Sequence, residues 1–358
     1  MTHATTTLGG TASSVVVGRV AHGLMLMTWR QDPIPDEQCF EAIKAGIDAL
    51  PPGAKMFLIG GNQLPSHRAE LGGISHYCLP GEFYGHNLAT TNLEMIARFF
   101  EKYPSYADKT FLSVKGGLVP NSYEPDCSAA NLRRSVEAIN EKLRGTKRLD
   151  LFQSARVDPN VPIEESIAAL VELKKEGKLD HIGMSECSAA SLRRGNAVHP
   201  ISAVEIEISP WSYEEETKTV IATAKELGVA VAGYAPLGRG FLTGQIKRPE
   251  DLPEGDFRRS LPRFQKDAMR HNFAIVDALS EIAKKKNVTA AQLSIAWVSA
   301  LGPHVIPIPG SSHAKRTLEN CAAGDVELTP EELDEINRVI DSADIQGERY
   351  RTAHTLWG

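Results

Sequence analysis

The sequence predicts an α/β protein built as a single (β/α)₈ TIM barrel. From residue 20 onward, short apolar runs alternate with amphipathic segments through eight rounds, the pattern of repeated βαβ units. No Pro- or Ser-rich linker divides the chain, and no G-x-G-x-x-G follows the first expected strand, which disfavours a doubly wound sheet. The expected strands cover residues 22–27, 55–59, 110–116, 149–156, 181–186, 203–209, 229–236 and 304–310.

The expected helices lie between these strands and carry apolar side chains at positions i, i+3, i+4 and i+7. Two segments are longer than the repeat requires: residues 237–290, which hold an extra helix after the seventh strand, and the tail after residue 328. Such additions usually cover the C-terminal face of a barrel. The clearest helical segments are residues 36–50, 128–143, 163–177 and 214–228.

The chain is expected to have three parts. Residues 1–17, rich in Thr, Ser and Gly and without a signal-peptide pattern, are expected to be a flexible leader. Residues 18–345 would form the barrel, and residues 346–358 a C-terminal tail.

Composition excludes several classes of function. A net charge of -6, from 39 basic and 45 acidic residues, argues against a nucleic-acid or anionic-membrane partner. No apolar run approaches the roughly 20 residues of a membrane span. The five cysteines are scattered without C-x-x-C spacing, so neither a metal site nor a disulfide framework is expected. We therefore expect a cytoplasmic protein without a bound metal.

Polar residues at the expected strand ends are candidates for chemistry, because barrel active sites form there. Tyr84 follows the second strand, Lys115 ends the third and Arg156 ends the fourth. A nearby ammonium lowers the pKa of a phenol, so Tyr84 and Lys115 together suit proton donation to a substrate oxygen that Arg156 polarises. Such a trio suits carbonyl reduction, in which a hydride arrives at carbon and a proton at oxygen. Alternatively, Tyr84 packs in a turn, Lys115 caps a strand and Arg156 pairs with Asp158.

A second candidate site follows the eighth strand, where "PIPGSSHAKRTLEN" (307–320) runs from a Pro-Gly turn into a helix. The free N–H groups of a helix N-terminus attract anions such as phosphate. Ser311 and Ser312 can donate hydrogen bonds there, and Arg316 can bind a phosphate with two parallel bonds. The alternative is an ordinary N-cap serine.

Six segments together resemble the aldo-keto reductases, most closely their fungal pyridoxal reductase branch: "GEFYG", "SVKGG", "LDLFQSARVDPNVPIE", "GMSE", "GYAPLGRGFLTG" and "IPIPGSSHAKRTLEN". They occur in the expected order between residue 18 and about residue 345. The resemblance implies a (β/α)₈ barrel, NADP(H) as cofactor and reversible reduction of a small-molecule aldehyde or ketone. In this branch the substrate would be pyridoxal, reduced to pyridoxine in vitamin B6 metabolism, or another aromatic aldehyde. The oligomeric state stays open.

The resemblance also implies roles for individual residues. Tyr84 would donate the proton, with Lys115 as its partner and Arg156 where most relatives have His. Tyr234 would stack on the nicotinamide. The residues implied to bind the nicotinamide carboxamide are Ser185, Glu186 and Glu205, those along the pyrophosphate Leu237, Gly238, Arg239 and Gly240, and those at the adenosine 2′-phosphate and adenine Ser311, Arg316, Glu319 and Asn320.

One departure concerns the aspartate that the family places five residues before the tyrosine and pairs with the lysine. Leu79 stands there, with Glu82 the nearest acid to Tyr84. A catalytically weak nicotinamide-binding sensor or auxiliary subunit on the same barrel is therefore the alternative function.

Residues 61–80 fit no element and are expected to be translated intron or a recent insertion, since barrel loops usually run to about six residues. Removing them joins "KMFLIG" to "GEFYG", and Gly61-Asn62 and Pro80-Gly81 can be encoded by splice-donor and splice-acceptor sequences. Ile59 would then stand at the place of the aspartate. The alternative is a functional lid.

Overall fold

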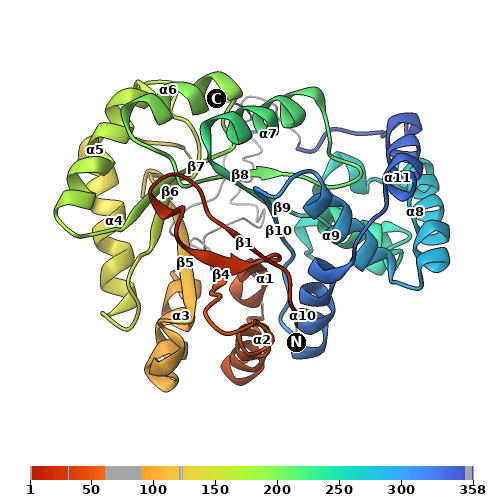
Figure 1. Cartoon of the computed structure of the whole chain (residues 1–358), viewed down its shortest axis with the longest axis horizontal. Coiled ribbons are helices and arrows are strands. Elements are labelled where there is room, and N and C mark those ends of the chain that lie inside the picture. The colour runs from red at the N-terminus through yellow and green to blue at the C-terminus, as the bar shows by residue number, and fades with distance from the viewer. Residues whose placement is uncertain are drawn as a thin grey trace.

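Eight parallel strands form a barrel in the computed structural model, which describes residues 2–30, 32–60, 90–120, 122, 124–350 and 357. The strands pair in chain order from β3 to β10. A parallel bridge between Gly23 and Gly310 closes the ring (Figure 1). The strands are β3 (His22–Gly23), β4 (Met56–Gly60), β5 (Thr110–Gly116), β6 (Leu151–Ser154), β7 (His181–Ser185), β8 (Ala203–Glu207), β9 (Ala230–Tyr234) and β10 (Val305–Ile308).

Helices surround the strands, as Figure 1 shows, and the predicted fold class is confirmed. Helices α8 and α11 pack against each other. The helices are α1 (Met25–Thr28), α2 (Asp36–Asp48), α3 (Thr91–Lys102), α4 (Ala129–Leu143), α5 (Ile163–Lys175), α6 (Ala189–Val198), α7 (Glu215–Leu227), α8 (Lys266–Lys286), α9 (Ala290–Ala300), α10 (Ala314–Ala322) and α11 (Pro330–Ser342).

The barrel has two apolar layers. Between strands and helices lies a large cluster of buried side chains, whereas a second cluster lies inside the ring and draws on β4, β5, β6, β8, β9 and β10, taking every second residue where a strand contributes two. Phe111 and Ala203 belong to the inner cluster. Because inward positions recur every second residue, Lys115 on β5 and Glu205 on β8 also face the barrel interior.

The first strand is shorter than predicted. Residues 22–27 were expected to be extended, but β3 ends at Gly23 and the short helix α1 (Met25–Thr28) follows. The run "LMLM" contains no β-branched residue, and Leu and Met are good helix formers. Periodicity cannot separate strand from helix in so short an apolar run.

The expectation of a flexible leader at residues 1–17 is wrong for the residues described there. Strands β1 (Thr5–Thr7) and β2 (Val16–Gly18) form an antiparallel hairpin. Leu8 packs in the inner cluster, and Gly9 N–H donates to Ser202 O at 3.0 Å. The hairpin therefore covers the N-terminal end of the barrel. Its Thr and Val runs favour strands, but the surrounding Ser and Gly residues led to the expectation of a flexible leader.

The long segment after β9 forms short 3₁₀ helices before α8, and it contributes to the C-terminal face as expected. These are η4 (Gly238–Thr243), η5 (Pro249–Asp251), η6 (Phe257–Ser260) and η7 (Pro262–Phe264). The expected tail from residue 346 is buried at Arg349 and Tyr350.

Tyr84, Glu82 and the whole of segment 61–80 lie outside the described residues, so the expectations about them stay expectations. In the part of the chain that the structure describes, no helix has the length and apolar character needed to cross a membrane.

The hairpin makes a testable difference to stability. Leu8→Ala should lower the free energy of unfolding by about 2–3 kcal/mol, because it opens a cavity in the inner cluster. Val16→Ala is the matched control, since Val16 lies on the same hairpin but is 39% exposed, and it should change stability by less than about 0.5 kcal/mol. Urea denaturation of both variants measures the difference, and equal effects would contradict the docked hairpin.

Candidate active site

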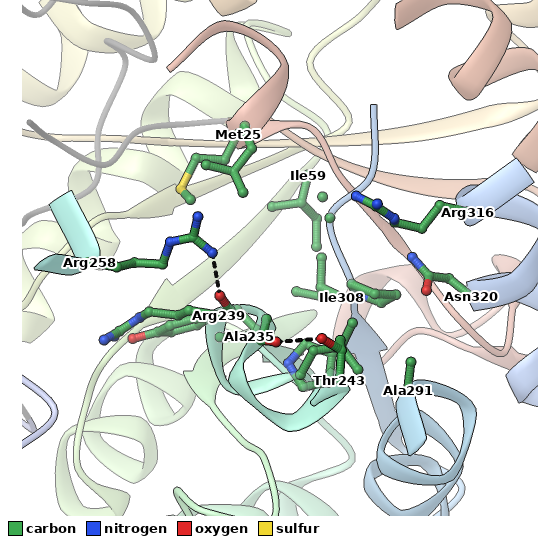
Figure 2. A pocket seen from close by; sticks show the side chains of 18 of the residues that line it. Met25, Ile59, Ala235, Arg239, Thr243, Arg258, Ala291, Ile308, Arg316 and Asn320 are labelled. Atoms are coloured by element: carbon green, nitrogen blue, oxygen red, sulfur yellow. Dashed lines mark hydrogen bonds between the residues drawn. The ribbon is translucent and has the colours of Figure 1, made fainter. Parts of the chain in front are cut away.

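A cavity of about 530 Å³ opens at the C-terminal ends of the strands (Figure 2). Residues far apart in the chain meet there: Lys115 from β5, Arg156 after β6, Ser185 from β7, Glu205 from β8 and Tyr234 from β9. The sequence-based expectation that strand-end residues converge is thus met for these five, whereas Tyr84 lies outside the described residues.

Lys115 forms a buried ion pair with Glu205, and their side chains are 6% and 2% exposed. The second carboxylate oxygen of Glu205 accepts a hydrogen bond from Gln153 Nε2 at 2.9 Å, and the same amide nitrogen lies 2.8 Å from Ser113 Oγ. Lys115 therefore does not serve as a strand cap. Within the described part of the chain, its ammonium has the Glu205 carboxylate as partner.

Arg156 is buried against the cavity and makes few hydrogen bonds. Its Nη1 donates to Ala155 O at 2.7 Å, and its Nε has no partner among the described residues. The alternative pairing with Asp158 does not form, because the Asp158 carboxylate accepts from the backbone N–H groups of Cys127 and Asn160, both at 2.8 Å. As far as the described residues go, the rest of the guanidinium is thus left available to a ligand.

The ring of Tyr234 lines the cavity, and hydrogen bonds hold its hydroxyl in place. The hydroxyl donates to Glu186 Oε1 at 2.7 Å and lies 3.0 Å from the hydroxyl of Tyr350. Burial, followed by the Glu186 carboxylate, raises the pKa of Tyr234 well above its usual value, so it stays a neutral phenol.

Glu186 does not line the cavity, contrary to the role that the family resemblance implied. Its backbone has a φ of 48°, in the left-handed region, and its fully buried carboxylate also accepts from the N–H of Glu207 at 3.2 Å. Glu186 therefore orients Tyr234, and the carboxamide contact that we expected from it lacks support in this geometry.

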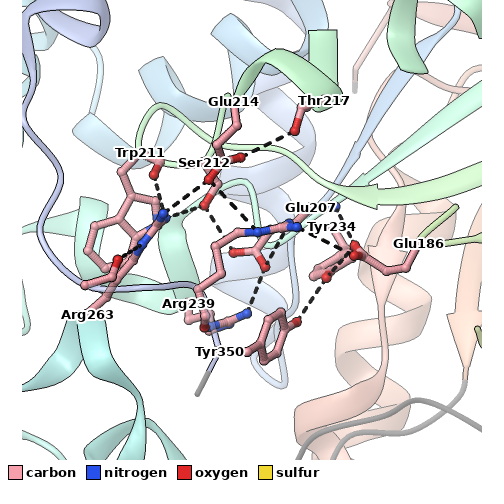
Figure 3. Close-up of polar contacts among 12 residues, drawn as sticks. Glu186, Glu207, Trp211, Ser212, Glu214, Thr217, Tyr234, Arg239, Arg263 and Tyr350 are labelled. Atoms are coloured by element: carbon pink, nitrogen blue, oxygen red, sulfur yellow. Dashed lines mark hydrogen bonds and ion pairs between the residues drawn. The ribbon is translucent and has the colours of Figure 1, made fainter. Parts of the chain in front are cut away.

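Buried charges join the cavity wall to the C-terminal segment (Figure 3). Arg239 Nη2 donates to Glu207 Oε2 at 2.8 Å, and Arg349 lies 3.7 Å from the carboxylates of both Glu186 and Glu207. Burial opposes ionisation of Glu207, but Arg239, Arg349 and Arg263 more than offset it and lower its pKa. The guanidinium of Arg239 stacks 4.7 Å from the Tyr350 ring centre.

At the other end of the cavity, helix α10 contributes Arg316, Glu319 and Asn320, three of the residues for which the family resemblance implied cofactor contacts. Figure 2 shows Arg316 approaching the cavity from the side opposite to Arg258. Ser311 does not line the cavity, because its hydroxyl is held in a local turn, donating to His313 O at 3.0 Å and accepting from His313 N–H at 3.2 Å. The N-cap alternative also fails, since the N-cap residue of α10 is His313.

The loop after β9 lies only partly on the cavity. Leu237, Arg239 and Gly240 line it, whereas Gly238 does not. An added Cβ at Gly238 would lie 2.6 Å from Trp211 Nε1, so this glycine permits close packing behind the wall.

The residues present fit a nicotinamide dinucleotide. Such a cofactor carries phosphates and polar rings, which require cations, amide donors and open backbone. Arg316 supplies charge, whereas Arg258 is paired with Asp256 at 2.6 Å, and the buried Asn320 has an Nδ2 without a partner among the described residues. At Gly310 an added Cβ would meet only Gly23 O, 3.6 Å away, so space remains beside this strand end. No cluster of three or more metal-binding side chains occurs among the described residues.

Sequence reasoning missed several residues at the site, among them Gln153, Arg258 and Tyr350. Gln153 could have been found, because a glutamine at an inward position of an otherwise apolar strand is unusual. Arg258 and Tyr350 carry no such signal, since they lie in irregular segments that the packing of the cavity wall brings to the site.

The chain belongs to the aldo/keto reductase family, whose sequence profile matches residues 69–341. It is therefore an oxidoreductase of a family that generally uses NAD(P)H. It is 36% identical over 339 residues to "Probable pyridoxal reductase 2" of Schizosaccharomyces pombe, covering 93% of this chain and 95% of that protein.

Two further comparisons agree on family and fold. "Aldo-keto reductase yakc [NADP(+)]" of the same yeast is 38% identical over 290 residues, covering 80% of this chain and 84% of that protein. Among solved structures, the glycerol dehydrogenase of Gluconobacter oxydans has a TM-score of 0.75 at 22% identity and covers 96% of this chain and 97% of its own. The latter likeness supports the (β/α)₈ fold.

The buried His22, behind the α10 loop, should make stability depend on pH. Burial lowers the pKa of His22 from 6.5 to about 4, against the raising effect of its hydrogen bond with Ser311 O at 2.8 Å. Since the unfolded chain takes up this proton near pH 6.5 and the folded chain only near pH 4, stability falls as the pH falls through this window. The loss should total about 3 kcal/mol. Denaturation curves of wild type and His22→Gln across the window should diverge by this amount; parallel pH dependences would contradict the assignment.

Proposed function

We propose that the protein is an NADPH-dependent reductase of pyridoxal or another aromatic aldehyde. The observation that carries the proposal is one cavity at the barrel rim that joins Lys115, Arg156 and Tyr234 to the Arg316 end of α10. A relative that covers nearly the whole chain bears the name of a pyridoxal reductase, which supports the substrate class.

The chain's own residues handle the substrate oxygen and its proton. Tyr84, the proposed donor, gives a proton to the oxygen, and the positive charge of Lys115 eases its loss from the phenol. Arg156 donates hydrogen bonds to the same oxygen as negative charge develops on it. The bound nicotinamide cofactor supplies the hydride that the carbonyl carbon accepts. Ser185 and Tyr234 form the wall on which its ring would rest.

The substrate half of the cavity favours a flat ring bearing a second oxygen. Met25, Leu26 and Phe257 provide apolar walls, while the buried Arg156 has no carboxylate partner among the described residues. A guanidinium presents a fork of donors that matches two neighbouring oxygens. Pyridoxal carries a phenolic oxygen beside its aldehyde, so both oxygens can share this fork.

The alternative of a catalytically weak sensor or auxiliary subunit depended on the absence of an acid to pair with Lys115. Glu205 provides a carboxylate for that ammonium. This pairing supports the reductase, which we favour over the weak sensor.

The function is tested by following loss of NADPH absorbance with pyridoxal, 2-hydroxybenzaldehyde and 4-hydroxybenzaldehyde. The two substrates with a neighbouring oxygen should be reduced with the higher kcat/KM. Tyr84→Phe should lower kcat by about 10²- to 10⁴-fold while cofactor binding persists, because the phenol supplies only the proton. Tyr213→Phe, which removes a hydroxyl outside the cavity, is the control. A Tyr84→Phe variant within a few-fold of wild type would refute the role.

Preference for NADPH over NADH is tested at Arg316. Its charge can bind the 2′-phosphate that NADH lacks, so Arg316→Ala should raise the KM for NADPH by about tenfold or more and leave that for NADH nearly unchanged. Lys315→Ala is the matched control, because Lys315 precedes Arg316 on α10 and is exposed without lining the cavity. Equal changes for both cofactors would count against the assignment.

A further inference from the structure

Lys115 and Glu205 connect opposite parts of the barrel. Their strands β5 and β8 are separated by β6 and β7 in the ring, so the ion pair crosses the interior beneath the cavity. Gln153 on β6 holds the second oxygen of Glu205 and also reaches Ser113 on β5. Both carboxylate oxygens therefore have fixed partners, and the carboxylate is held in one orientation.

Apart from Glu205, the neighbouring carboxylates on β8 and after β7 have partners other than Lys115. Glu207, two residues further along β8, pairs with Arg239, and Glu186 accepts from Tyr234. On β4, beside β5, the inward cavity position holds the apolar Ile59. Within the described residues, Glu205 is thus the carboxylate paired with Lys115.

We propose that Glu205 is the counter-ion and positioning residue of Lys115, so that β8 supplies the acid that β4 lacks. The inference rests on the proposed function, in which Lys115 assists the proton donor. Glu205 holds the ammonium at the cavity floor and offsets part of its positive field. This role is additional to the carboxamide contact first expected of Glu205, which lines the cavity and whose two oxygens already have Lys115 and Gln153 as partners.

A stability cycle tests the pair without turnover. Lys115→Met and Glu205→Gln should each lower the melting temperature of the ligand-free protein, because each leaves a buried group without its partner. The double variant should lose clearly less than the sum of the two. Additive losses would overturn the pairing, whether or not the wild type reduces aldehydes.

A pH profile tests the positioning role in a wild type that turns over. Loss of the Glu205 charge makes the surroundings of the proton donor more positive, which favours loss of its proton. For Glu205→Gln we therefore expect the alkaline limb of kcat/KM to move to lower pH by about one unit or more. Glu205→Asp keeps the charge and should keep the limb near its wild-type position.

Asp150→Asn is the matched control, since Lys147 Nζ and Asp150 Oδ2 form another buried pair at 2.7 Å outside the cavity. It should destabilise the protein but leave the pH profile unchanged. A folded Glu205→Gln variant with the wild-type profile would overturn the inference while leaving the proposed function intact. The other charged side chains that line the described part of the cavity are unchanged in these variants: Arg156, Arg239, Arg258, Arg316 and Glu319.

Discussion

A positive charge buried at the barrel rim must be balanced by a negative one, and strand β8 supplies the balance at two levels. Glu205 faces Lys115 at the floor of the cavity, and Glu207 faces Arg239 and Arg349 at its wall. Removing one partner of such a pair lowers the free energy of unfolding by about 3–5 kcal/mol. These pairs therefore hold in place the segments that carry the partners of Glu205 and Glu207. The loop after β9 and the C-terminal segment are both anchored by this strand.

The barrel itself could be predicted because its signal is repeated along the chain. Each strand-helix round carries its own apolar period, so an error at one element leaves the topology unchanged. The errors occurred where the local pattern is short. "LMLM" suits helix and strand alike, and the Thr runs of the N-terminal hairpin were concealed by the Gly and Ser around them.

The location of the site could be predicted from the sequence, but most of the contacts between its side chains could not. Strand ends must converge at one rim, which located Lys115, Arg156 and Tyr234. Side-chain direction depends on local backbone, and a positive φ turns Glu186 away from the cavity. Tyr350 reaches the site through long-range packing, which no local sequence pattern encodes.

The docking of the C-terminal segment has a consequence for biosynthesis. Arg349 and Tyr350 follow all eight strands in chain order, yet they complete the cluster of Glu186, Glu207 and Tyr234. A ribosome that has already delivered the last strand therefore still holds a chain whose buried carboxylates lack one guanidinium and whose cavity lacks part of its wall. A ligand that rests against Tyr350 meets its full wall only in polypeptides whose translation has passed residue 350, so its affinity should report whether this segment has docked.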